Sequence, residues 1–105
     1  MTDEVLVFTT AGSDPEARKI ANELVERRLA ACVNIVPRIQ SVYRWEGKVE
    51  SAEEFLLIIK TTKARSVDVK AAIRELHSYD LPECIVISME DGSTEYLNWI
   101  EESVG

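Results

Sequence analysis

The sequence predicts an α+β fold of the ferredoxin-like type, with the element order β-α-β-β-α-β, a long hairpin in the middle and an added C-terminal helix. Short apolar runs of strand length alternate with stretches whose apolar residues recur at helical spacing. Two strand-like segments meet at a glycine turn, as in a hairpin. The length of 105 residues indicates one domain over residues 1–105.

A continuous apolar run at Val5–Phe8 predicts the first strand, buried on both faces. A helix is expected directly after it. Ser13 and Glu16 have capping-box spacing, and Asp14 before Pro15 offers an alternative cap with proline at the first helical position. Five apolar residues then recur with the spacing of one buried stripe. They are Ala17, Ile20, Ala21, Leu24 and Val25.

The segment Leu29–Lys60 is expected to form the long β-hairpin. Its first half is rich in Val, Ile and Tyr, which suit a pleated surface, and its second half ends in the apolar run Phe55–Ile59. Gly47, in the segment Trp45–Lys48, can take the positive φ that a tight turn needs. Pro37 has no N–H for the ladder, so it marks a bulge or an edge position.

The second half of the chain predicts a helix, a strand and a last helix. The second helix has its apolar stripe at Val69, Ala72, Ile73 and Leu76. A strand is expected at Cys84–Ile87, after Pro82 ends the connection. Asp91-Gly92 then turns the chain, and Ser93 can cap a helix that carries Tyr96, Leu97, Trp99 and Ile100.

This topology leaves one face of the sheet without helices. Two right-handed crossovers place both main helices on the same face, yet three of the expected strands are apolar on both faces. An uncovered apolar face is not expected on a soluble monomer. The second face should therefore be buried by the terminal helix, by another subunit or by both, and we infer a homo-oligomer.

Composition excludes several classes of function. The net charge is −7 with no basic block, which argues against nucleic acid and anionic membranes as partners. No apolar run approaches the roughly 20 residues of a membrane span, and no signal peptide is recognisable, so a cytoplasmic location is expected. One histidine, four glycines and no phosphate-binding loop provide no catalytic constellation, so we do not expect an enzyme.

Two residues are candidates for metal ligands. His77, the only histidine, lies near the end of the second helix. It is either a locally hydrogen-bonded helix-end residue or a ligand for copper or zinc. Cys32 is either an inert buried thiol or a soft ligand, and Cys84 is expected in the core. The two cysteines form no CxxC motif or disulfide framework.

Several segments, in order and spacing over nearly the whole chain, resemble the CutA divalent-cation-tolerance family. They are Ala30–Asn34, Tyr43–Lys48, Lys60–Thr62, Leu76–Tyr79 with Pro82-Glu83, and Tyr96–Ile100. The resemblance implies a homotrimer in which sheets pack around the threefold axis and the hairpin engages neighbours. In some members copper ligands are assigned to a cysteine ending the first strand and to two adjacent histidines. This sequence has Thr9 and Leu76 at two of those places, Ser78 replaces a proline, and only His77 matches.

The resemblance also implies a cleft between subunits, and mixed aromatic and charged residues suit a small-ligand pocket. Trp45 is alternatively an interface anchor at the hairpin tip. Lys60 could pair with Glu83 or with an anionic ligand. The candidates for the lining are Tyr43, Trp45, Lys60, Tyr79 and Glu83.

Two functional hypotheses follow. The first is a trimeric metal-ion (copper) binding or response protein that uses His77 and Cys32, with copper or another divalent cation as its ion. The alternative is a trimeric small-ligand sensor similar to the PII signalling proteins, or a protein-anchoring scaffold, without metal binding.

Overall fold

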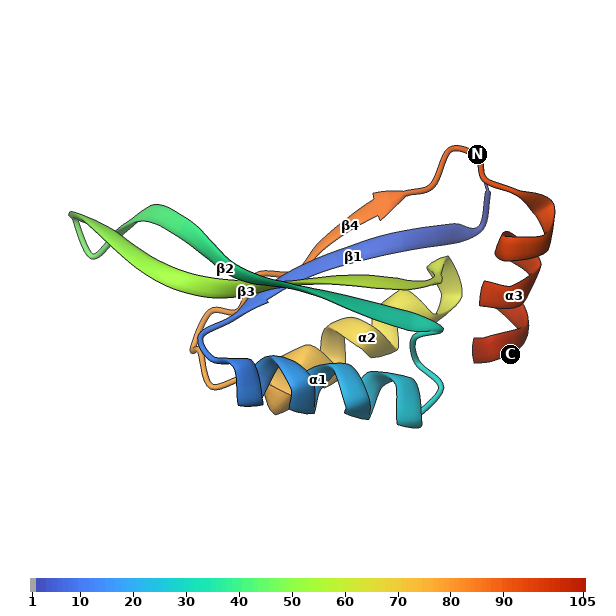
Figure 1. Cartoon of the computed structure of the whole chain (residues 1–105), viewed down its shortest axis with the longest axis horizontal. Helices are drawn as coiled ribbons and strands as arrows, with labels where there is room; N and C mark the ends of the chain where they lie inside the picture. Colours follow the sequence, from blue (N-terminus) through green and yellow to red (C-terminus); the bar gives the residue numbers. More distant parts are fainter. Residues whose placement is uncertain (1) are drawn as a thin grey trace.

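The computed structural model describes residues 2–105 and has the predicted ferredoxin-like architecture. A four-stranded antiparallel sheet has the strand order β2-β3-β1-β4. Helices α1 and α2 cover one face, and α3 stands at one end of the sheet (Figure 1). The elements are β1 (Glu4–Ala11), α1 (Asp14–Glu26), β2 (Cys32–Trp45), β3 (Lys48–Thr62), α2 (Lys63–Leu76), β4 (Ile85–Ser88) and α3 (Thr94–Val104).

Helix α1 begins as predicted, because Ser13 is its N-cap and Ser13 Oγ accepts a hydrogen bond from the Glu16 N–H at 3.3 Å. Ala17, Ile20 and Leu24 are fully buried against the sheet. The prediction for Val25 was wrong, since this side chain is 43% exposed. Each residue turns about 100° around a helix axis, so the residue after Leu24 lies at the edge of the stripe.

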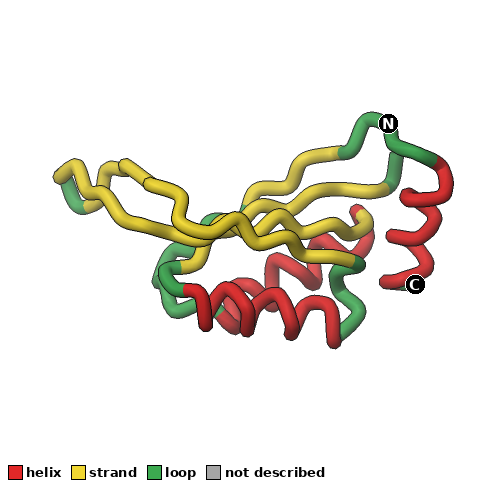
Figure 2. The backbone as a smooth tube through the Cα atoms, viewed as in Figure 1, coloured by secondary structure: helices red, strands yellow, loops and turns green. Residues whose placement is uncertain are grey.

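The hairpin forms as predicted, and Trp45 pairs with Lys48 across a two-residue turn. Glu46 (φ +48°) and Gly47 (φ +80°) both have left-handed backbones, as a type I′ turn requires. A β-bulge interrupts β2 between Val36 and Ile39, where Pro37 lies, and β2 is also the edge strand. Beyond the end of β1 the hairpin arm projects from the body of the molecule (Figure 2).

The main core lies between the helices and the sheet. It contains Val5, Val7, Leu57 and Ile59 from the strands and Ile20, Leu24, Val69 and Ile73 from the helices. Thr62 caps α2 by accepting a hydrogen bond from the Arg65 N–H. Cys84 packs against this core, as predicted, and Cys32 is half-buried.

Strand β4 lies at the sheet edge and begins one residue later than predicted. Its apolar side chains are largely exposed, Ile85 by 51% and Ile87 by 42%, although the sequence suggested a strand buried on both faces. Ile85 and Ile87 lie opposite Phe8 and Leu6 and therefore share their face. This face of the sheet is the one that helices α1 and α2 do not cover, so part of the hydrophobic run of β4 stays exposed.

Helix α3 covers only the end of this open face. Ile100 and Val104 are buried, and Tyr96 lies beside Lys60 at the end of β3. Ser93 is the N-cap as predicted, but its side chain makes no capping hydrogen bond. Within residues 2–105, no helix combines the length and the apolar character that crossing a membrane would need.

Candidate functional site

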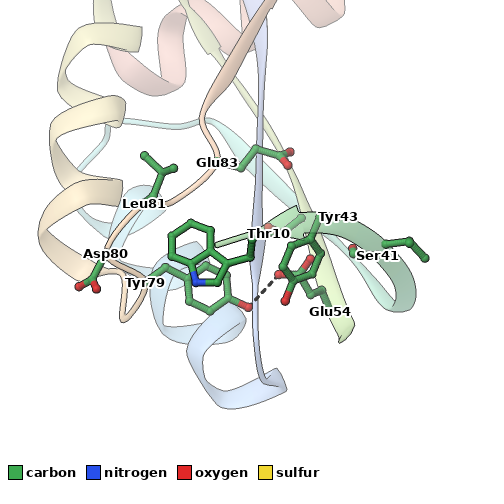
Figure 3. A pocket seen from close by; sticks show the side chains of 10 residues that line it. Thr10, Ser41, Tyr43, Glu54, Tyr79, Asp80, Leu81 and Glu83 are labelled. Carbon is green, nitrogen blue, oxygen red and sulfur yellow. Dashed lines mark hydrogen bonds between the residues drawn. The ribbon is translucent and has the colours of Figure 1, made fainter. Parts of the chain in front are cut away.

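A cleft of about 590 Å³ lies where the hairpin leaves the sheet. Its walls come from the end of β1, the hairpin arm and the loop between α2 and β4 (Figure 3). The polar lining consists of Thr10, Ser41, Glu54, Asp80 and Glu83. The aromatic and apolar lining consists of Val42, Tyr43, Trp45, Tyr79 and Leu81.

Glu54 lies at the base of the cleft because of strand register. Strand β1 pairs with β3 only as far as Phe55, so Glu54 is the first β3 residue beyond the end of β1. The bulge in β2 places Ile39 opposite Glu54, and odd-numbered residues such as Tyr43 therefore share its face. Glu54 is only 8% exposed, and Tyr79 donates a 2.7 Å hydrogen bond from its hydroxyl to Glu54 Oε2.

His77 holds the loop that carries Tyr79. Its Nδ1 accepts a 3.1 Å hydrogen bond from the Tyr79 backbone N–H, and its Nε2 contacts the Thr10 carbonyl. A carbonyl accepts only from a protonated nitrogen, so these partners specify the neutral Nε2–H tautomer. The His77 side chain is 0% exposed. Both ring nitrogens are thus engaged within the fold.

Glu16 secures the same loop from helix α1. Its Oε2 accepts a 2.8 Å hydrogen bond from the Ser78 N–H, and its Oε1 accepts one from Gly12. Partial burial acts to raise the pKa of Glu16, but the hydrogen bonds from Ser78 and Gly12 outweigh it. The net result is a lowered pKa, so the Glu16 carboxylate stabilises the loop in its ionised form.

The electrostatic character of the cleft is acidic. Three of its ten lining residues are carboxylic acids, Glu54, Asp80 and Glu83, and none is lysine or arginine. Burial, followed by the charge of Glu54, raises the pKa of Glu83. Burial and the hydrogen bond to Glu54 also raise the pKa of Tyr79, which keeps its hydroxyl protonated as the donor. The cleft is therefore suited to a positively charged group.

The structure brings together four of the five residues proposed for the cleft: Tyr43, Trp45, Tyr79 and Glu83. Lys60 is not among the lining residues. It lies six residues after Glu54 on β3, about 20 Å along an extended strand. Its Nζ is 3.3 Å from the Tyr96 hydroxyl and lies over the Tyr96 ring, so it is paired with α3 instead of with Glu83.

The two candidate metal ligands lie apart within one chain. The His77 ring contacts Thr10, which pairs with Leu56, whereas Cys32 pairs with Lys60. Leu56 and Lys60 are separated by about 14 Å of strand. In the part of the chain that the structure describes, no group of three or more His, Cys, Asp or Glu side chains could hold a metal ion. His77 and Cys32 of one chain therefore do not fit a common metal site.

Sequence reasoning did not identify Glu54, Thr10, Ser41 and Asp80 as cleft residues. Glu53 and Glu54 are neighbours on β3 and lie on opposite sides of the strand, since Glu53 is exposed and Glu54 is buried. The position of Glu54 opposite Tyr79 depends on strand register and on the path of the loop. The signal available in the sequence was spacing: Glu54 lies two residues before Leu56 and four before Ile58, so on a strand all three side chains point to the same face, which is the open one.

The fold and cleft define a class of protein: a small ferredoxin-like domain with an acidic cleft and an open apolar sheet face. More specifically, the chain belongs to the CutA1 family, since a family profile described as "CutA1 divalent ion tolerance protein" matches residues 5–103. A divalent-cation tolerance protein CutA from Thermus thermophilus is 45% identical over 97% of this chain and 99% of its own length. The crystal structure of CutA from Xylella fastidiosa superposes with a TM-score of 0.97 at 39% identity, covering 99% of this chain and 100% of that one.

The expectation of a cytoplasmic location was wrong as an inference from this sequence. A structure from Archaeoglobus fulgidus, 43% identical with a TM-score of 0.95 over 97% of this chain and 99% of that one, is named as a periplasmic divalent cation tolerance protein. An Arabidopsis thaliana relative, 44% identical over 94% of this chain, is named as chloroplastic, and this chain spans 54% of its length. The same folded domain thus occurs in several compartments, so its charge and hydropathy do not specify one.

Proposed function

We propose that this chain acts in divalent-cation tolerance as a non-enzymatic binding protein, and that the acidic cleft at the base of the hairpin is its ligand site. The observation that carries the proposal is Glu54, a buried carboxylate fixed by Tyr79 inside a cleft of ligand size. The names of its relatives support the link to divalent cations.

The residues of the cleft support binding without catalysis. His77, the only histidine, has both ring nitrogens in hydrogen bonds, so it does not serve as a general base. The cleft hydroxyls of Thr10 and Ser41 lack an imidazole partner to activate them. The role is therefore that of a sensor or a buffer for its ligand.

Growth complementation tests this function. Cells that lack their own relative should regain growth in copper, zinc or cobalt salts when they express the wild-type chain. Glu54→Gln, which keeps the shape of the side chain and removes its charge, should fail to restore growth. Glu53→Gln, on the opposite side of the same strand, is the matched control. Equal rescue by both variants would rule out the cleft as the functional site.

We propose a homo-oligomer from the open sheet face, and a homotrimer from what the resemblance to the CutA family implies. Ile85 and Ile87 continue the apolar surface of Leu6 and Phe8, and α3 covers only its end. Light scattering should give a mass of three chains for the wild type, and Ile87→Glu should lower it. Val67→Glu, at an exposed position of α2, should not change the mass. A wild-type chain that scatters as a monomer would contradict the proposal.

Copper binding is a second candidate, favoured by the position of Cys32. Its half-buried thiol lies on strand β2 with Sγ 3.8 Å from Asn34 Oδ1, and thiolates are soft ligands that suit copper. Other copies packed on the same face would have to complete the ligand set. Calorimetric titration of copper and zinc under reducing conditions should show binding that is lost in Cys32→Ser. Retention of full affinity in Cys32→Ser would argue for a different site.

A further inference from the structure

The cleft has an excess of negative charge that no side chain in its own lining balances. Glu54, Asp80 and Glu83 all face it, and no lysine or arginine lines it. The hydrogen bond from Tyr79 occupies Oε2 of Glu54, and a carboxylate offers about four lone-pair sites, so further donors can be accepted there. Partial burial and, after it, repulsion from Glu54 raise the pKa of Glu83, and a cation between the two carboxylates would offset that repulsion.

The walls favour an organic cation over a bare metal ion. Tyr43, Trp45 and Tyr79 present three aromatic rings, which attract ammonium and guanidinium groups through their faces. A volume of about 590 Å³ is far larger than a desolvated ion requires and lies within the range of small-molecule pockets. The carboxylates do not converge as metal ligands within residues 2–105.

The apolar part of the lining indicates the shape of the ligand. Leu81 and Val42 are exposed apolar side chains in the same cleft as the carboxylates. A ligand with a charged head and a short aliphatic stem would satisfy both surfaces, because the stem removes apolar area from water while the head meets Glu54.

We infer that the cleft binds a small aliphatic amine or guanidine, with its cationic head between Glu54 and Glu83 and its stem against Trp45 and Leu81. This inference rests on the proposed function, which makes the cleft the ligand site, and it adds the chemical class of the ligand.

Fluorescence of Trp45 provides a direct test. The chain has two tryptophans, so Trp99→Phe leaves Trp45 as the sole reporter in the assembled protein. Butylammonium and butylguanidinium should change its emission with saturation at about millimolar concentration or below. Butanol, the neutral analogue, and butyrate, the anionic one, should produce no saturable change.

Variants then distinguish recognition of the positive charge of the ligand from non-specific binding. Glu54→Gln and Glu83→Gln should each weaken butylammonium binding about tenfold or more, since each removes one charge-assisted contact. Glu83 is only partly buried and is more exposed than Glu54, so its variant is expected to fold even if Glu54→Gln does not. Glu53→Gln should leave the affinity unchanged within about twofold.

Three outcomes would overturn the inference. The first is an absence of any saturable response to butylammonium and butylguanidinium, and the second is equal binding of butanol. The third is a Trp45 response to copper or zinc that depends on Glu54, with none to the amines. That third result would contradict this inference but leave the proposed function intact. If no cation changed the Trp45 emission and Glu54→Gln restored growth fully, both the inference and the proposed function would be contradicted.

Discussion

The Tyr79 hydroxyl donates a 2.7 Å hydrogen bond to Oε2 of Glu54, and this contact joins the loop after α2 to the base of the hairpin (Figure 3). Two segments 25 residues apart in sequence thereby form one wall of the cleft. Because Glu54 is buried, the bond also provides the carboxylate with a donor that water would otherwise supply.

Tyr79→Phe should destabilise the chain by about 1–3 kcal/mol, because it leaves a buried carboxylate oxygen without its donor. Chemical denaturation measures the free energy of unfolding. Tyr43→Phe, at another tyrosine of the cleft, is the control and should cost less than about 0.5 kcal/mol. Equal losses in the two variants would contradict the assigned role of the Tyr79 hydroxyl.

His77→Ala should destabilise the chain by about 2–4 kcal/mol, because it removes a fully buried ring and the partners of the Thr10 carbonyl and the Tyr79 N–H. The loss should be the same with copper present or with a chelator. Thermal unfolding under both conditions measures it. A loss of stability seen only with copper present would identify His77 as a metal ligand.

Glu16→Gln should lower stability by about 1–3 kcal/mol near neutral pH, since the ionised carboxylate accepts hydrogen bonds from the loop. Its pKa is lower in the folded state than the ordinary 4.5. This contribution is therefore complete above the unfolded pKa and is lost as the pH falls through the folded pKa. Denaturation from neutral pH to about pH 3 should show the two chains converging, with Glu26→Gln as the control on the same helix.

Glu83→Gln should have the opposite effect and raise stability near neutral pH. The folded-state pKa of Glu83 is raised above 4.5, so the folded chain holds this proton more tightly than the unfolded chain does. Ionisation of Glu83 therefore reduces stability as the pH rises through the folded pKa. The gain from the variant should be present at neutral pH and absent under acidic conditions where the carboxyl is protonated. A gain that does not change with pH would contradict this account.

Glu46→Asn should stabilise the hairpin tip by about 0.5 kcal/mol, since Glu46 has a φ of +48° and asparagine tolerates that backbone better. Gly47→Ala should destabilise it by about 1 kcal/mol, because Gly47 has a φ of +80°. Hydrogen exchange at the tip amides reports both changes locally. Faster exchange in Glu46→Asn than in the wild type would contradict the turn assignment.

Local patterns in the sequence were sufficient for most of the fold. Apolar spacing located α1 and α2, the Ser13 cap fixed the start of α1, and Gly47 and Pro37 marked the turn and the bulge. Val25 and β4 were harder to predict, because their exposure depends on which face meets a neighbour and on strand order. The identity of an apolar residue does not show whether its own chain or another subunit covers it.

The cleft was only partly predictable for a related reason. Its aromatic residues and Glu83 lie in segments that resemble the family, so they could be proposed from sequence. The roles of Glu54 and His77 depend on contacts with Tyr79 and Thr10, which are distant in the chain. Lys60 was proposed for the cleft because it also lies in a segment that resembles the family, yet the register of β3 places it beside Tyr96.

The bulge between Val36 and Ile39 determines which side of the hairpin arm faces the cleft. It adds one residue to β2 and so sets which alternate side chains of the arm share the face of Glu54. If the same residues paired in a regular ladder beyond Val36, Arg38 would lie opposite Glu54, and Arg44 would share its face in place of Tyr43 and Trp45. The bulge thus gives an acidic cleft an aromatic wall where an uninterrupted strand would place an arginine.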